Sequence, residues 1–134
     1  MHAITNSFSR EISAHFDAYF KHFNLATSYI ELIILVHKEG EVTQKALAEN
    51  MNLAPSTITR FVQKLVKMDL LEKSKNGRIA LLQLTPKAEK LAAELTITYN
   101  KAVEDLEAKL GEKFVHTTEQ LLQHGLNVLA QKKD

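Results

Sequence analysis

The sequence predicts a mainly α-helical fold that carries one small β-hairpin. Apolar residues recur at three- and four-residue spacing through most of the chain, which is typical of amphipathic helices. Gly40, Pro55, Pro86 and Gly111 lie where such helices begin or end, and Asn76-Gly77 marks one tight hairpin turn. With 134 residues, of which 45% are hydrophobic, the chain is long enough to form one domain with its own core.

Composition and motifs exclude several classes of protein. The absence of cysteine excludes disulfides, thiolate metal sites and thiol-based redox sensing. No stretch approaches the ~18 apolar residues of a membrane span, and the first residues lack the apolar segment of a signal peptide, so we expect a cytoplasmic protein without a membrane contact. The histidines form no His-x-x-x-His pair, and no catalytic pair or glycine-rich phosphate loop occurs. We therefore expect no metal site, no cofactor and no enzymatic activity.

Two helices are expected in the N-terminal third of the chain. The first spans residues 7–23, and its apolar stripe consists of Phe8, Ile12, Phe16, Tyr19, Phe20 and Phe23. The second begins at Ser28, because Ser28 and Glu31 fit a capping box, and it ends at Gly40, a typical C-terminal glycine.

A short helix, a tight turn and a longer helix follow. Thr43 is expected to cap a helix over residues 44–50, residues 51–54 form the turn, and Pro55 begins a helix that reaches about Met68. The spacing on the longer helix predicts one buried face, made of Ile58, Phe61, Val62, Leu65 and Val66. This order of elements is the helix-turn-helix arrangement, which places the N-terminal part of its second helix in the major groove of DNA.

The opposite face of this helix carries side chains of the types that commonly contact nucleic acids. It consists of Ser56, Thr57, Thr59, Arg60, Gln63, Lys64 and Lys67. Arginine pairs with guanine, glutamine with adenine, and threonine offers a methyl group to thymine. An ordinary surface helix is the alternative, but such helices usually mix Glu with Lys, and residues 55–68 contain no acid.

A basic hairpin is expected beside this helix. Strands over residues 70–73 and 79–84 flank the Asn76-Gly77 turn, with Lys73, Lys75 and Arg78 near the tip. Residues 54–78 hold six basic residues and two acids, a net charge of +4, whereas the rest of the chain carries −3. Such a patch is typical of a protein with a polyanionic partner, although scattered solvated lysines are the alternative.

The two C-terminal helices are expected to take part in dimerisation. Thr85-Pro86 begins the fifth helix, whose near-heptad seam consists of Leu91, Leu95, Tyr99, Ala102, Val103, Leu106 and Leu110. After Gly111, the sixth helix carries Phe114, Val115, Leu121, Leu122, Leu126 and Leu129. Together with the first helix these stripes predict an intertwined homodimer, and a monomeric helical bundle is the alternative.

These motifs resemble the MarR family of bacterial regulators (multiple-antibiotic-resistance regulators). The resemblance rests on residues 43–49, 56–65, 70–73 and 76–78, with Leu84-Thr85 following the hairpin. It implies a single MarR-like domain over residues 1–134, with a winged helix-turn-helix at 28–90 and dimerisation helices at 1–25 and 90–134. Three positions depart from the family pattern: Asn76 replaces an aspartate of the wing, the wing is shorter, and Asp69 stands where a glycine is expected.

The resemblance also implies a function and its residues. We expect a ligand-responsive repressor that binds a pseudo-palindromic operator in double-stranded DNA as a homodimer, or alternatively a winged-helix protein-interaction module or antagonist. The residues expected to contact DNA are Thr43, Gln44, Ser56, Thr57, Thr59, Arg60, Gln63, Lys64, Lys73, Lys75 and Arg78. A small lipophilic or phenolic effector is expected beside Phe16, Tyr19, Phe20 and His22, although a core or surface role for His22 is the alternative.

Overall fold

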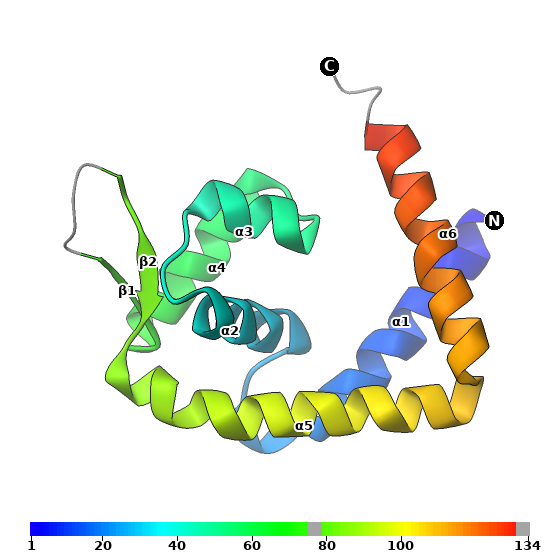
Figure 1. The fold of residues 1–134 in the computed structure, drawn as a ribbon, viewed down its shortest axis with the longest axis horizontal. Helices are drawn as coiled ribbons and strands as arrows, with labels where there is room; N and C mark the ends of the chain where they lie inside the picture. Colours follow the sequence, from blue (N-terminus) through cyan, green and yellow to red (C-terminus); the bar gives the residue numbers. More distant parts are fainter. Residues whose placement is uncertain (75–78, 131–134) are drawn as a thin grey trace. The chain divides into compact units, whose positions relative to one another are not determined.

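The mainly helical fold with one β-hairpin is confirmed. The computed structural model describes residues 1–74 and 79–130 (Figure 1). The chain divides into two compact units, Met1–Tyr99 and Asn100–Asp134, and one helix runs through the boundary. In chain order the elements are α1 (His2–Tyr19), the 3-10 helix η1 (Lys21–Phe23), α2 (Thr27–Glu39), α3 (Gln44–Met51), α4 (Pro55–Lys67), β1 (Leu71–Lys73), β2 (Leu82–Leu84), α5 (Pro86–Leu110) and α6 (Glu112–Ala130).

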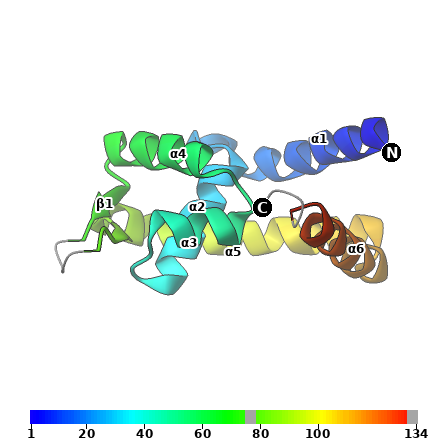
Figure 2. The same cartoon turned by 90° about the horizontal axis from the view of Figure 1, so that it is seen from above.

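The core of the first unit is built around α2. In Figure 1, α2 lies between α5 on one side and α3 and α4 on the other, and the view from above in Figure 2 separates α4 from α3. Helix α2 packs against α3 and β2, while α4 packs against α3 and β1. Side chains from α2, α3, α4, the hairpin and α5 form one cluster, whose fully buried members include Ile30, Leu32, Leu47, Ile58, Leu65, Leu82 and Leu95.

The amphipathic character predicted for α4 is confirmed, with one correction. Ile58, Val62 and Leu65 are buried and Phe61 is half-buried, as the spacing predicts. Val66 is 45% exposed, so its assignment to the buried face is wrong. The stripe drifts around the helix, and the core contact of the last turn is made by Leu65 alone.

The boundaries predicted for the first two helices are also corrected. Helix α1 begins at His2 and ends at Tyr19, after which Phe20 leaves the helix with φ −113° and Asn24 is left-handed. The capping box expected at Ser28 and Glu31 is absent, because α2 begins at Thr27 without a side-chain cap from its own N-terminus. The Asp17 carboxylate of α1 takes that role, accepting from the Thr27 amide (3.0 Å) and hydroxyl (2.6 Å).

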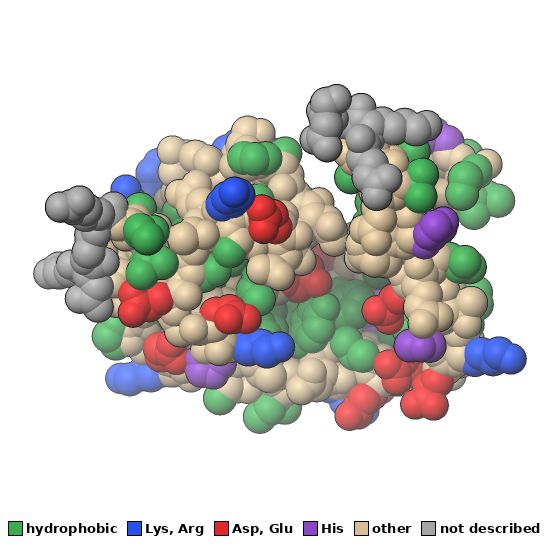
Figure 3. Space-filling view, turned by 45° about the horizontal axis from the view of Figure 1, so that its top comes forward, with side chains coloured by type: hydrophobic (Ala, Val, Ile, Leu, Met, Phe, Trp, Pro, Cys, Tyr) green, Lys and Arg blue, Asp and Glu red, His purple; other side chains and the backbone are tan. Residues whose placement is uncertain are grey.

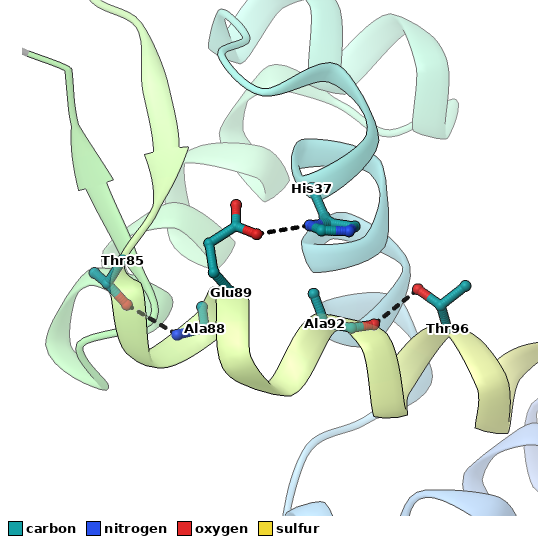
Figure 4. A network of polar contacts seen from close by, with 6 residues as sticks. All are labelled: His37, Thr85, Ala88, Glu89, Ala92 and Thr96. Atoms are coloured by element: carbon teal, nitrogen blue, oxygen red, sulfur yellow. Dashed lines mark hydrogen bonds and ion pairs between the residues drawn. The ribbon is translucent and has the colours of Figure 1, made fainter.

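The predicted caps around the helix-turn-helix are confirmed. Thr43 Oγ1 accepts from the Ala46 amide at 3.1 Å, and α2 ends at Gly40 with φ +83°. Asp69 adopts φ +60° where a glycine was expected, so the chain leaves α4 through a left-handed residue without one. The buried hydroxyl of Thr85 donates to the Asp69 carbonyl (2.7 Å) and accepts from the Ala88 amide (3.2 Å), which caps α5 (Figure 4).

The hairpin is antiparallel, and its second strand is shorter than predicted. Leu71 pairs with Leu84 and Lys73 with Leu82, and Val42 adds an isolated bridge to Leu82. Strand β2 covers only residues 82–84, and the Ser74 amide donates to the Leu81 carbonyl just before it. The predicted turn at Asn76-Gly77 lies outside the described residues.

The N-terminal half of α5 packs into the core of the first unit. Ala88, Ala92 and Leu95 belong to the core of the first unit, and His37 Nδ1 on α2 lies 2.8 Å from Glu89 Oε2 (Figure 4). The N-terminal half of the predicted dimer seam therefore packs within the chain, which corrects its assignment to a second copy. The Leu91 and Tyr99 side chains also pack against this core.

Helix α6 is largely exposed within the second unit. It follows Gly111, which has φ +93°, and it contains no buried residue. Leu121 and Leu129 are 66% and 63% exposed, and Figure 3 shows apolar side chains at the surface along the segment that leads to the C-terminus.

Leu65 and its neighbour Val66 provide a matched test of this packing. We expect Leu65→Ala to lower the free energy of unfolding by about 2–5 kcal/mol, because it opens a cavity in the core. Val66→Ala should change it by less than about 1 kcal/mol, because that side chain already contacts solvent. Urea unfolding at one protein concentration measures both, and equal losses would contradict the burial described for α4.

Candidate nucleic-acid interface

The N-terminal half of α4 presents a polar surface. Ala54 precedes the helix without a side-chain cap, and Pro55 occupies its first turn. Ser56, Thr59, Arg60 and Gln63 are exposed, as predicted, whereas Thr57 is half-buried. These side chains come from successive turns of one helix, so a single docking of α4 brings them to one partner.

Hydrogen bonds order two of these side chains. The Arg60 Nη2 group donates to Thr57 Oγ1 at 3.4 Å, one turn earlier on α4. Gln44 Nε2, at the start of α3, donates to Thr59 Oγ1 at 3.2 Å. The second bond joins the two helices of the helix-turn-helix through residues that were each expected to contact DNA separately.

Lys64 is held by an aromatic pair that the sequence analysis did not identify. Its Nζ atom lies 4.6 Å from the centre of the Tyr29 ring on α2, a cation–π contact. The Tyr29 ring in turn packs on Phe61 at 4.4 Å between centres. The contact spans 35 positions in the sequence, so no local pattern indicates it, and it orients the third turn of α4 against α2.

The cations of α4 have no acidic partners in the part of the chain that the structure describes. There the ion pairs are His22–Glu94, His37–Glu89 and Lys101–Asp105, none of which involves α4. Arg60, Lys64 and Lys67 therefore leave positive charge available to a polyanion.

The sequence analysis did not identify one contact at the C-terminal end of α4. There Lys87 Nζ donates to the Met68 carbonyl at 3.1 Å.

The other residues expected to bind DNA fall into two groups. Thr43 is half-buried and its hydroxyl oxygen is occupied as the cap of α3, while Lys73 is exposed at the end of β1. Lys75 and Arg78 lie outside the described residues. The described part of the hairpin is braced by a bond from Gln83 Nε2 to Glu72 Oε1 (3.1 Å).

A cleft of about 400 Å³ opens beside the helix-turn-helix. It is lined by Glu31, Ile34, Leu35, Lys38, Asn50, Met51, Asn52 and Tyr99. The Tyr99 hydroxyl donates to Glu31 Oε2 at 2.9 Å, which fixes one edge of the cleft. The lining therefore combines apolar side chains and amide groups with one cation, Lys38, and one carboxylate, Glu31, and such a mixture can surround a small organic ligand.

The four residues expected beside an effector do not line this cleft. Phe20 is fully buried, Tyr19 is half-buried, and Phe16 stacks on Tyr99 with ring centres 5.3 Å apart. His22 is exposed and lies 4.0 Å from Glu94. Phe16 thus reaches the cleft only through Tyr99, a residue that the sequence analysis assigned to the dimer seam.

Residues 1–74 and 79–130 contain neither a metal site nor a membrane-spanning helix. No group of three or more His, Asp or Glu side chains there has the arrangement of a metal site. None of the described helices has the length and apolarity needed to cross a membrane.

Comparison with known proteins shows a likeness to one family of regulators. Residues 28–78 match the model of the MarR family, which covers α2 through β1. The family match covers this segment, which is less than half of the chain. The transcriptional regulator ZitR of Lactococcus lactis subsp. cremoris is 27% identical over 109 residues, which are 79% of this chain and 74% of that protein.

Solved structures have the same fold as this chain. Ligand-free NadR matches with a TM-score of 0.80 at 19% identity, over 100% of this chain and 99% of that one, and NadR in complex with 4-hydroxyphenylacetate matches with 0.75 at 20% identity, over 99% and 100%. A mutant of MarR from E. coli complexed with operator DNA matches with 0.79 at 16% identity, over 93% and 92%. At these identities the solved structures show a shared winged helix-turn-helix fold.

Proposed function

We propose that this regulator binds a pseudo-palindromic operator as a homodimer, reads the major groove with α4, represses transcription, and leaves DNA when a small effector binds. One observation carries the DNA-binding part: α4 exposes an acid-free face whose cations lack acidic partners in the described chain. The likeness to MarR in complex with operator DNA supports the same orientation of α4.

Arg60 is the strongest candidate for reading a base. Its guanidinium group presents several donors in a fixed fork, which fits the two acceptors of guanine in the major groove. The bond to Thr57 restrains the side chain before DNA binds, and this lowers the entropy that binding must overcome.

Arg60→Ala should weaken binding to the selected operator by about tenfold to 100-fold and relax the preference at one base pair in each half-site. Arg10→Ala is a matched control, because Arg10 makes the same kind of bond to a hydroxyl one turn earlier, to Ser7 at 3.1 Å, but on α1. A fluorescence titration at fixed salt measures both variants. Unchanged affinity and base preference in Arg60→Ala would remove Arg60 from the interface.

The same titration at several salt concentrations separates the DNA-binding function from the alternative of a protein-interaction module. Phosphate contacts release counterions, so log K should fall with log salt by about 0.9 per neutralised phosphate. A protein-interaction module would show neither this slope with a selected operator nor a preference among duplexes.

Helix α6 supports the homodimer. Its exposed apolar residues recur along one stripe, which includes Phe114, Leu122, Leu126 and Leu129. Monomeric proteins rarely expose a continuous stripe of this kind. A two-fold dimer would place its recognition helices about 34 Å apart, one turn of DNA, and this explains why we expect two symmetric half-sites.

Leu122→Glu should shift the protein from dimer to monomer at micromolar concentration. In a two-fold dimer the substitution is present in both copies, so two leucines are lost from the interface. This loss corresponds to an increase in the dimer Kd of roughly a hundredfold or more. Gln120→Glu adds the same charge at an exposed polar position of α6 and serves as the control. A wild-type protein that is monomeric by light scattering would overturn the homodimer.

The cleft supports the effector. It joins the apolar side chains of Ile34, Leu35 and Met51 with the cation of Lys38, a combination suited to a small phenolic or lipophilic acid. It also touches the turn between α3 and α4, so a molecule bound there contacts the helix-turn-helix directly. NadR, a structural neighbour, has been solved in complex with 4-hydroxyphenylacetate, a molecule of this class.

We expect 4-hydroxyphenylacetate or related phenolic carboxylates to bind and to lower operator affinity. Lys38→Met should raise their Kd by roughly tenfold, because a charge-assisted hydrogen bond is lost. It should leave the binding of neutral phenols unchanged. Lys45→Met, on the exposed side of α3, is the control. Calorimetry measures the Kd, and a carboxylate affinity that is insensitive to Lys38 would exclude this cleft.

A further inference from the structure

The hydroxyl group of Thr59 is engaged within the protein. It donates to the Pro55 carbonyl at 3.0 Å, one turn earlier on α4, and accepts from Gln44 Nε2 on α3 at 3.2 Å. Thr59 is nevertheless exposed and lies on the face of α4 that carries Arg60. The Oγ1 atom of Thr59 is therefore bonded within the protein, although the residue lies on the face of α4 that is proposed to contact DNA.

The two bonds limit what Thr59 can do at a DNA surface. A hydroxyl group has one donor and two acceptor positions, and the donor and one acceptor are already occupied. Two bonds to different helices also fix the side-chain rotamer, since Oγ1 must meet both the Pro55 carbonyl and the Gln44 amide. An exposed threonine in this state has no hydrogen left to donate, and it offers a partner its methyl group and one remaining acceptor position.

We propose that Thr59 reads a thymine through its methyl group, and that Gln44 is a positioning residue that holds it in this orientation. The proposal rests on the DNA-binding function proposed above and deepens it by naming the chemistry of one contact. The thymine 5-methyl group lies in the major groove, and apolar contact with it distinguishes thymine from cytosine. Thr59 and Gln44 then act as one unit of specificity, although Gln44 itself need not touch DNA.

The neighbouring hydroxyls differ from Thr59. Thr57 only accepts a bond, from Arg60, and keeps its own donor for other partners. Ser56 makes no side-chain hydrogen bond to any described residue and carries no methyl group. Polar contacts with bases or phosphates therefore fall to Ser56, Thr57 and Arg60, and the apolar contact falls to Thr59.

The experiment first uses the wild-type protein to select an operator from a random DNA pool. Each thymine of a half-site, with its symmetric mate, is then replaced by deoxyuridine, which removes only the 5-methyl group. At one position we expect the Kd of the wild type to rise about fourfold per half-site, equivalent to the loss of one buried methyl contact. Thr59→Ser should bind both duplexes with equal affinity. Thr59→Val loses both bonds of the hydroxyl group but should keep the wild-type preference for thymine, because valine strongly prefers one rotamer in a helix, whereas threonine divides between two unless its hydroxyl is held.

Two further variants test the positioning role and the general effect of the substitution. Gln44→Ala should reduce the ratio between thymine and deoxyuridine duplexes while leaving the salt slope unchanged. Thr96→Ser is the matched control, because Thr96 donates to the carbonyl four residues earlier, Ala92, at 2.8 Å, but lies on α5 (Figure 4). Its thymine preference should equal that of the wild type.

The outcomes distinguish the contact from the function on which it rests. Selective operator binding in which no thymine separates wild type from Thr59→Ser would overturn the methyl contact alone. A loss of thymine preference in Thr59→Val, with retention in Thr59→Ser, would also overturn it, because the hydroxyl group would then be the reader. A wild type that selects no operator would overturn the DNA-binding function together with this contact.

Discussion

The burial of one apolar stripe on α4 determines the rest of the interface. Ile58, Val62 and Leu65 pack into the core around α2, and this rotation of the helix leaves Ser56, Thr59 and Arg60 at the surface. The hydrophobic effect stabilises the packing of α4, but it is non-directional. The spacing of the apolar residues therefore decides which side chains of α4 remain at the surface, where DNA could be contacted. A shift of the stripe by one position would present a different set of side chains.

Polar contacts between distant segments then refine this arrangement. Asp17 starts α2, Gln44 orients Thr59, and Tyr29 supports Lys64, each from another helix. At the end of α4, Thr85 and Lys87 bind the carbonyls of Asp69 and Met68, which relieves the unpaired groups that every helix terminus leaves. The recognition helix is thereby held at several points along its length.

The sequence was sufficient to predict the features that depend on neighbouring residues alone. The helix-turn-helix, the Thr43 and Thr85 caps and the exposed face of α4 follow from spacing and capping within a few residues. Predictions failed where a distant partner decides: Asp17 replaced the capping box, and the first half of the α5 seam packs against its own chain. The cleft was missed because its lining comes from three separate helices and a turn, and periodicity carries no information about such combinations. All the expected DNA contacts, including those of Lys75 and Arg78, remain predictions.

The core of the first unit extends well beyond the segment that matches the MarR family model. The matching segment ends at residue 78, whereas Leu82, Leu84, Ala88, Ala92 and Leu95 all belong to the same cluster of buried side chains. During synthesis the helix-turn-helix therefore leaves the ribosome with its core still open, and the N-terminal half of α5 closes it last. A fragment cut at the end of the matching segment would expose that surface permanently, so the smallest autonomous folding unit is longer than the helix-turn-helix itself.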